Sequence, residues 1–510
     1  MPWSVDTEAR PAVSVAPEPS ASPRRRAGWA ARLLLPSLAV AVFAVTLLQV
    51  LVVSEGARTL FRDSDAGWHI RTGERILAGG EVPRTDSYSF THAGRAWMAW
   101  EWFSDAILGA AHRIDGLRGV ALLMATVIAA TALAWCALAM RLGANFFLVA
   151  AGAALLLGTT SIHWLARPHV FSWMLALLFV TGAELRGRWL WALPAAALFW
   201  ANMHGSFLLG PAILALYALG CVLRRERAAA GSLASTALAS LAVSFINPYG
   251  WRLHAHIFEY LQNSYLMDRI SEFRSFSFHS PGAIYVEGYL LAAAAGLVIA
   301  LRRKAYPQAL LIGAMVHLGL YSARHLPTGA VIALPVALAL ITVELRTLGR
   351  SRLSAFLDYG DRLRAWDRQM LGVVPLVLAV VLASAALRVM PSGFDPETFP
   401  VKAAAFFETR QDSARLFARD QWGGYLIYRF DGRLKVFVDG RSDFYGTDSL
   451  ERYATIADVK PGWDAALDAE RVNYVLVRPD QALAQALLAT KRWRVAHADH
   501  VALVFERGPA

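Results

Sequence analysis

The chain has 510 residues, of which 56% are hydrophobic and only 17% are charged, a balance that excludes a soluble domain of this size. A net charge of +11 would suit a nucleic-acid partner, but the basic residues form short clusters between apolar runs, as in cytoplasmic loops, so we expect no nucleic acid. The two cysteines, Cys136 and Cys221, lie in apolar stretches and predict neither a disulfide framework nor a cysteine metal site.

The N-terminal residues 1–30 are rich in Pro, Ala, Ser and Arg and show no hydrophobic periodicity, which predicts a disordered cytoplasmic segment. The apolar run at 31–53 follows a cluster of arginines, as the hydrophobic part of a signal peptide does. It is longer than that part, and no small-residue cleavage site follows it. We therefore expect an uncleaved first membrane span.

Further apolar runs, each roughly 15 to 24 residues long, predict more spans. They begin near residues 117, 145, 168, 189, 206, 232, 285, 307, 326 and 372. With the first run they make about eleven helical spans in a transmembrane domain at 31–390. Basic clusters lie between alternate pairs of runs, at 141, 186–188, 224–227, 302–304 and 346–364. The positive-inside rule then predicts a bacterial inner-membrane protein with a cytoplasmic N-terminus and a periplasmic or extracellular C-terminal region.

The connections on the opposite side are rich in polar groups. Several join runs that are too short for two full crossings, so their turns are expected to dip into the membrane, where irregular backbone needs protein or a water-filled cavity around it. This predicts a polar cleft that opens outward. Its expected lining is Arg167, His169, Asn202, His204, Arg324 and His325. The alternative is that these side chains only cap helices and reach for lipid head groups.

The first external loop, residues 54–116, is long enough for short helices that lie on the membrane surface. The stretch 70–77 has one apolar face and is followed by Gly79 and Gly80, which predicts a short amphipathic helix. Loops of this length usually carry function, so the polar residues of this one are candidates for chemistry.

Four acidic or imidazole side chains stand out in this loop. Asp63 and Asp65 directly follow the first span, His69 comes four residues later, and Glu101 lies between two tryptophans. A partly desolvated carboxylate there can act as general base towards a hydroxyl, and Asp63, Asp65 and His69 are candidate ligands for a divalent cation, although the sequence makes no cofactor certain. The alternative is that Asp63 caps a helix and Glu101 is a first-turn acid.

Hydropathy falls near residue 391, and residues 391–510 are predicted to form a small extracytoplasmic α/β domain. Expected strands lie at 436–439, 474–477 and 501–505, and expected helices at 462–469 and 481–490. Asp439, Arg441 and Asp443 follow the first of these strands, where ligands often bind in α/β sheets, so this loop is a candidate sugar-binding site. The alternative is a turn in which Arg441 pairs with a neighbouring acid and fixes the loop against the membrane part.

The pieces DSDAGWHIRTGERIL, VPRTDSYSFT, WEW, RPHVFSWML, NMHGSFLLG, NPYGWRL, ARHLP, WGGYLIYRF and VFVDGRSDFYG run through most of the chain. On these pieces the chain resembles the GT-C superfamily of integral membrane glycosyltransferases, and more narrowly a broad group of bacterial polytopic membrane proteins of that type. WEW departs from the more usual His before the Glu, which puts the role of that position in doubt.

The resemblance implies a sugar donor linked to polyprenyl phosphate, an inverting transfer to a glycan, lipid or protein acceptor, and contact with membrane lipids. It implies Asp65 or Asp63 as base, Glu101 as a further acid of the loop, and Arg167 and Arg324 as phosphate ligands, because a guanidinium offers a fork of donors that keeps its charge. Two alternatives stay open, a transporter or flippase for a lipid-linked intermediate and a non-catalytic assembly subunit. A transporter needs polar groups near the bilayer midplane and often has repeated halves, whereas this chain places its polar groups at one end of the spans.

Overall fold

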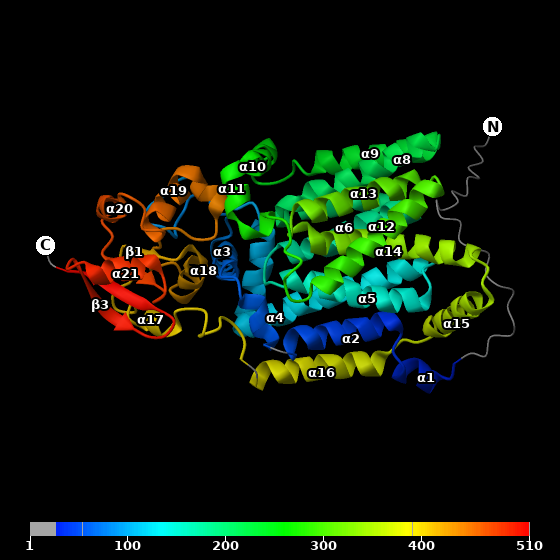
Figure 1. Cartoon of the computed structure of the whole chain (residues 1–510), viewed down its shortest axis with the longest axis horizontal. Helices are drawn as coiled ribbons and strands as arrows, with labels where there is room; N and C mark the ends of the chain where they lie inside the picture. Colours follow the sequence, from blue (N-terminus) through cyan, green and yellow to red (C-terminus); the bar gives the residue numbers. More distant parts are fainter. Residues whose placement is uncertain (1–26, 54, 390, 509–510) are drawn as a thin grey trace.

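Residues 27–53, 55–389 and 391–508 are described by the computed structural model. Most of the segment predicted to be disordered, residues 1–26, lies outside these ranges. Figure 1 shows a bundle of long helices joined at one end to a smaller part that contains a sheet. The chain is therefore a helical membrane-type protein with a small C-terminal α/β sheet, as the sequence predicts.

Each predicted apolar run contains a helix, because runs of Leu, Ala and Val form helices whose apolar side chains pack together in the bundle. The first and last of these helices lie side by side along one edge (Figure 1). The helices are α1 (Trp29–Leu34), α2 (Leu38–Leu51), α4 (Trp102–Arg141), α5 (Phe146–Thr160), α6 (His169–Leu185), α7 (Arg188–Met203), α8 (Leu209–Leu223), α9 (Arg227–Val243), α12 (Ala283–Arg302), α13 (Tyr306–Tyr321), α14 (His325–Thr347) and α16 (Val373–Val389). A polar helix, α15 (Ser351–Asp367), lies between α14 and α16 in the sequence.

Six helical segments within the described ranges are long and apolar enough to cross a membrane. They are Trp29–Leu51, Trp102–Arg141, Phe146–His163, Gly205–Leu223, Ala283–Arg302 and His325–Thr347. Two further helices, α6 and α16, are also apolar but are shorter than these six segments. These segments make the chain a multi-pass membrane protein by length and composition, and the number of about eleven spans stays a prediction.

The segments at the sheet end of the bundle are short. In the first loop, α3 (Asp65–Gly79) packs against the start of α4. It is longer than the helix predicted at 70–77, because its N-terminal turn is buried against residues 391–508, which we call the external part after their predicted location. The other short helices are η1 (Gly56–Phe61), η2 (Ser161–His163), η3 (Gly205–Leu208), α10 (Trp251–Gln262), α11 (Ser264–Arg269) and η4 (Ser271–Phe273). These connections carry the polar residues that the sequence singled out.

The sheet has four strands in the order β1-β2-β4-β3. β1 (Leu416–Ala418) pairs parallel with β2 (Tyr474–Val477), and β4 (Leu503–Arg507) pairs antiparallel with β2 and with β3 (Trp493–Ala498). The helices of this part are α17 (Val401–Ala405), α18 (Asp420–Arg429), α19 (Ser442–Ala457), α20 (Trp463–Ala469) and α21 (Ala482–Ala489). The strand predicted at 436–439 is wrong, because Val436 makes only single bridges and no ladder continues from it.

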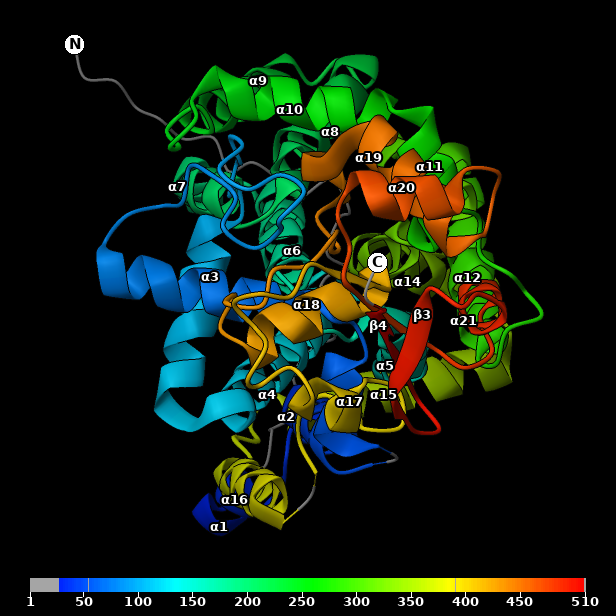
Figure 2. The ribbon, with the colours of Figure 1, turned by 90° about the vertical axis from the view of Figure 1, so that its left-hand side faces the viewer.

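The first external loop and the external part share a hydrophobic core. Trp68, Tyr88 and Trp97 of the loop pack in the same buried cluster as the strands and helices after residue 391. The backbones of α3 and α18 also touch, since a Cβ on Gly424 would lie 2.2 Å from the carbonyl oxygen of Ser64. Figure 2, viewed from the end of the molecule that carries the sheet, shows α18 lying across the end of the bundle beside α3. The loop is therefore built into the external part as well as into the bundle.

Candidate active site

An arginine from the start of α6 holds the two acids of the first loop. Asp63 precedes α3, and Asp65 is in its first turn, where the helix dipole favours a carboxylate. Arg167 Nη1 donates to Asp63 Oδ2 at 2.6 Å, and its Nη2 lies 3.2 Å from Asp65 Oδ2. These side chains come from segments about a hundred residues apart, and the fold brings them together as one charged group.

A glutamate that the sequence reading did not single out completes this group. Glu272, in η4, lies 3.4 Å from Arg167 Nη1 and 3.8 Å from Arg324 Nη1. Burial alone would raise the pKa of Glu272, but the charges of Arg167 and Arg324 outweigh burial and lower the pKa to about 2. Glu272 is therefore ionised, and it fixes the spacing of the two guanidinium groups.

Two carboxyl groups hold their protons more tightly than usual. Burial, reinforced by the charge of Asp63 and opposed by Arg167, raises the pKa of Asp65 to about 7. Burial, opposed by Arg167 and Arg324, raises the pKa of Glu101 to about 8. Both pKa values are therefore raised into the range around neutral pH, where a carboxyl group can exchange a proton with a bound substrate.

Two histidines flank Glu101. His69 Nδ1 is hydrogen-bonded to Asp105 Oδ1 at 2.6 Å, and its other ring nitrogen lies 3.8 Å from Glu101 Oε2. His204 Nε2 lies 3.6 Å from Glu101 Oε1, on the other side of the carboxyl group. Burial, followed by the charge of Arg167, lowers the pKa of His69 well below its usual value, so its imidazole is neutral at pH 7. Glu101 is therefore held between uncharged rings rather than in an ion pair.

The site opens into two neighbouring cavities. The inner cavity has a volume of about 60 Å³ and is lined by Glu101, His169, His204 and Asp443, among others. The outer cavity has a volume of about 530 Å³ and is lined by Asp63, Glu272 and Asp439, among others. Both cavities are lined by Asp65, Arg167, Arg324, Tyr260, Gly440 and Ser442. An acid and two guanidinium groups thus lie in the wall that the two cavities share.

Some of the residues predicted to line a cleft lie elsewhere. Asn202 is away from both cavity linings, where it accepts a hydrogen bond from Trp102 Nε1 at 2.9 Å. His325 is also outside both linings. The proposed cation ligands do not converge, because His69 faces Asp105, and the described residues contain no group of three or more His, Cys, Asp or Glu that could hold a metal ion.

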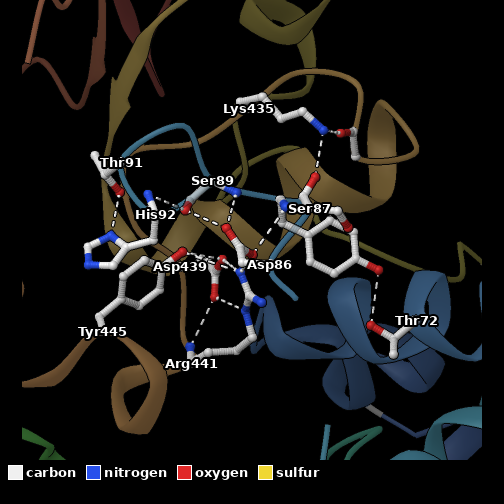
Figure 3. Close-up of polar contacts among 12 residues, drawn as sticks. Thr72, Asp86, Ser87, Ser89, Thr91, His92, Lys435, Asp439, Arg441 and Tyr445 are labelled. Atoms are coloured by element: carbon white, nitrogen blue, oxygen red, sulfur yellow. Dashed lines mark hydrogen bonds and ion pairs between the residues drawn. The ribbon is translucent and has the colours of Figure 1, made fainter. Parts of the chain in front are cut away.

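The loop at 439–443 of the external part is fixed by a buried ion cluster. We call this cluster the Arg441 seam (Arg441, Asp439, Asp86 and Tyr445). Arg441 Nη2 lies 2.7 Å from Asp439 Oδ2 and 2.8 Å from Asp86 Oδ1 of the first loop (Figure 3). Tyr445 donates to Asp439 Oδ2 at 2.8 Å, and burial and the charge of Asp439 raise the pKa of the Tyr445 phenol, which keeps its proton. Next to the seam, Gly440 covers Asp65 so closely that a Cβ would lie 1.8 Å from Asp65 Oδ1.

The residues that the sequence reading missed are Asp105, Glu272, Tyr260 and Asp86. Asp105, Glu272 and Asp86 each contact a predicted residue, and Tyr260 lines both cavities. Asp86 lies within the piece VPRTDSYSFT, but that piece does not indicate which of its residues has a distant partner. Glu272 gave a weak signal, since it is an acid on the predicted outer side between two apolar runs. The other partners become visible only when the chain is folded.

No protein-family model and no curated protein sequence matches the chain. Solved structures do match it. The oligosaccharyltransferase of Archaeoglobus fulgidus with a tethered acceptor peptide has a TM-score of 0.55 and 12% identity over 86% of this chain and 68% of that one. The same archaeal enzyme, AglB, with an inhibitory peptide and a dolichol-phosphate has a TM-score of 0.54 and 13% identity over 86% and 69%. ArnT from Cupriavidus metallidurans in the apo state has a TM-score of 0.48 and 16% identity over 93% and 98%.

The similarity to the archaeal oligosaccharyltransferase shows the fold. The chain therefore has a GT-C-like fold, which is the fold that the resemblance of its sequence motifs implies.

Proposed function

We propose that the protein transfers a sugar from a polyprenyl-phosphate-linked donor to an extracytoplasmic acceptor at the two cavities. One observation carries this proposal: Asp65, Arg167 and Arg324 line both cavities, so a base and two phosphate ligands meet at one place. The fold supports it, because a structurally similar archaeal oligosaccharyltransferase has been solved with a dolichol-phosphate.

In the proposed reaction an acceptor hydroxyl oxygen attacks the anomeric carbon of the donor sugar. A new glycosidic bond forms, the bond from that carbon to the phosphate oxygen breaks, and the polyprenyl phosphate leaves with the electron pair. The hydroxyl proton passes to the Asp65 carboxylate, whose pKa of about 7 lets it accept a proton near neutral pH. Attack on the face opposite the phosphate inverts the configuration at the anomeric carbon.

The guanidinium groups of Arg167 and Arg324 have different roles in the proposed reaction. Arg167 contacts Asp63 and Asp65, so it positions the base beside the donor phosphate that it binds. Among the described residues the Arg324 side chain makes an ion pair with Glu272 at 3.8 Å and lies over the Phe273 ring, which leaves N–H donors for the leaving phosphate. Glu101, mostly neutral at pH 7 with a pKa of about 8, serves as a hydrogen-bond donor to the bound sugar.

The proposed setting is a bacterial inner membrane crossed by about eleven spans at 31–390, with residues 391–510 in the periplasm. Both native cysteines are buried, so a single introduced cysteine reports its own side of the membrane. In intact spheroplasts a membrane-impermeant maleimide is expected to label Glu81→Cys in the first external loop and not Arg350→Cys. Labelling with the opposite sidedness would remove the basis for a periplasmic site.

The central experiment substitutes the proposed base. A deletion strain is complemented with wild type, Asp65→Asn or Asp63→Asn/Asp65→Asn, and its glycans and lipids are profiled. An amide has the shape of the acid but cannot accept the proton, so we expect product to fall by about 10²-fold or more while the protein still inserts. Glu81→Gln, an exposed acid change in the same loop, is the matched control and should keep full activity.

Full product in the double variant would overturn the assignment of the base. If product and lipid-linked donor were both unchanged while the variant protein was less stable, the acids would be structural and the protein an assembly subunit. If lipid-linked donor were retained on the cytoplasmic face instead, the result would favour transport over transfer.

A further inference from the structure

A third cavity of about 360 Å³ lies beside the inner cavity, and we call it the basic groove. It is built where three distant parts of the chain meet, namely the first external loop, α10 with the turn before it, and the start of α19. The lining includes Arg84, Arg95, Trp97, Tyr249, Arg252 and Asp443. Trp97 and Asp443 also line the inner cavity, so a ligand in the groove reaches the edge of the proposed reaction site.

The groove carries an excess of positive charge. Arg84, Arg95 and Arg252 are all exposed, and within the described part of the chain none of the three is paired with a carboxylate. Arg84 donates to the Pro248 carbonyl oxygen at 3.1 Å and lies over the Tyr249 ring, contacts that fix its direction without neutralising its charge.

The acid that lines the groove is already occupied. Asp443 Oδ2 lies 3.0 Å from His256 Nε2, and this hydrogen bond with the charge of Asp443 outweighs burial and raises the pKa of His256. The pair is close to neutral overall when His256 is protonated, so it offsets little of the arginine charge. Three guanidinium groups in a concave surface are therefore free to bind an anion.

The position of the groove indicates where that anion comes from. α10 has exposed apolar side chains, Trp251, Phe258 and Leu261, and Phe245 and Ile246 just before it are exposed as well. A helix with one exposed apolar face and a basic residue beside it is typical of the membrane interface. α10 lies at the outer end of the bundle, next to α11 and close to α19 (Figures 1 and 2). The basic groove thus opens at the level of lipid head groups.

We propose that the basic groove binds the anionic head group of a membrane lipid and presents that lipid as the acceptor of the transfer. The inference rests on the proposed function, because it supplies the acceptor for that reaction. The donor phosphate is assigned to different residues, Arg167 and Arg324, so the two anions are held at the same time by separate arginines. A hydroxyl of the acceptor lipid then enters the inner cavity past Trp97 and Asp443 towards Asp65.

The experiment measures binding without requiring transfer. Full-length protein in neutral detergent is titrated with dihexanoyl phosphatidic acid, dihexanoyl phosphatidylcholine and inorganic phosphate, and binding is followed by native mass spectrometry and thermal shift. We expect wild type to bind phosphatidic acid at least about tenfold more tightly than phosphatidylcholine, since each charge-assisted contact strengthens binding by about tenfold. We expect it to bind phosphatidic acid more tightly than inorganic phosphate, because only the lipid has apolar chains that can contact the exposed apolar side chains of α10.

The variants locate that binding. Arg84→Gln/Arg95→Gln/Arg252→Gln is expected to lose the preference for phosphatidic acid, whereas the lysine versions of the same three changes keep part of it. Lys402→Gln/Lys491→Gln/Arg494→Gln removes the same charge from exposed positions of the external part and should bind like wild type. Equal binding by the groove variant and this control would overturn the proposal, and so would equal affinity for phosphatidic acid and phosphatidylcholine. Equal affinity for free phosphate would overturn the lipid assignment.

The failure of this inference and of the proposed function can be told apart. Asp63→Asn/Asp65→Asn should bind phosphatidic acid like wild type, because neither acid lines the groove. If the groove variant transfers sugar normally, the acceptor inference fails while the proposed function stands. If wild type binds phosphatidic acid at the groove but the acid variants leave the glycans unchanged, the proposed function fails alone.

Discussion

Arg441 holds two carboxylates and Arg167 holds three, and the surroundings of the two arginines differ. The side chains of Arg441, Asp86 and Asp439 are at most 1% exposed, and the ion pairs are 2.7 and 2.8 Å long. Arg167 is 18% exposed, and its contact with Asp65 is 3.2 Å long at the wall of two cavities. The first cluster is closed around its own charges, whereas the second has room for another charged group.

Arginine and carboxylate side chains thus have a structural role in one cluster and a proposed chemical role in the other. In the Arg441 seam the acids come from the first loop and from the external part, so the pairing ties the two together. A buried ion pair adds little net stability over an apolar contact, but it costs much when one partner is lost. Around Arg167 the acid Asp65 keeps a pKa of about 7, which is a cost to stability that suits a reacting group.

The largest effect that separates the two clusters is on stability. Arg441→Ala leaves Asp86 and Asp439 buried without a cation, and we expect it to cost about 3–5 kcal/mol. Arg167→Ala should cost about 1 kcal/mol at pH 7, because Asp65 can take up a proton and Asp63 is 26% exposed to solvent. Thermal unfolding and protease resistance in detergent measure both changes.

The order of the same two variants is expected to reverse when product formation is measured in place of stability. Arg167→Ala is expected to abolish transfer in protein that remains folded, while Arg441→Ala loses activity only in proportion to folded protein. Similar stability losses in the two variants would contradict the distinction between a closed cluster and an open one.

A smaller effect is expected from pH. Transfer should rise as pH approaches 7, by about tenfold per pH unit below that value, because Asp65 acts in its ionised form and its pKa is about 7. Above about pH 8 transfer should fall as Glu101 ionises, and Glu101→Gln should remove this alkaline fall while keeping the acidic one.

Between about pH 4 and 7 the folding stability is expected to change with pH in the opposite direction to transfer. The pKa of Asp65 is raised on folding, so the unfolded chain loses this proton first and the folded state loses stability as pH rises from about 4 to 7. Asp65→Asn should not show this loss. A pH profile of unfolding that is identical in wild type and Asp65→Asn would mean that Asp65 is not perturbed.

The helical bundle was predictable because the helix in each apolar run follows from the composition of that run alone. The strand predicted at 474–477 coincides with β2, since four buried apolar residues in a row suit a strand covered on both faces. The run at 436–439 has a similar composition but no ladder partner, and pairing cannot be read from one segment. The span count likewise depends on how each helix sits in a membrane.

The candidate site was predictable in part. Asp65, Arg167 and Arg324 were identified because they are polar groups repeated on one side of apolar runs, and the structure brings them to shared cavity walls. Asp86 and Glu272 were missed because their partners lie far along the chain, 355 residues away for Asp86. Long-range partners of buried charges follow from the fold and not from local spacing.

The close cover of Asp65 by Gly440 limits how this protein can be recombined. The side chain of any other residue at 440 would occupy the place of the Asp65 carboxylate, and any other residue at 424 would push against Ser64. A chimaera that exchanges residues 391–510 with those of a distant homologue therefore has to carry both glycines in register with its first loop. In such an exchange the two segments have to be treated as one unit, although about 270 residues separate the end of the first loop from residue 391.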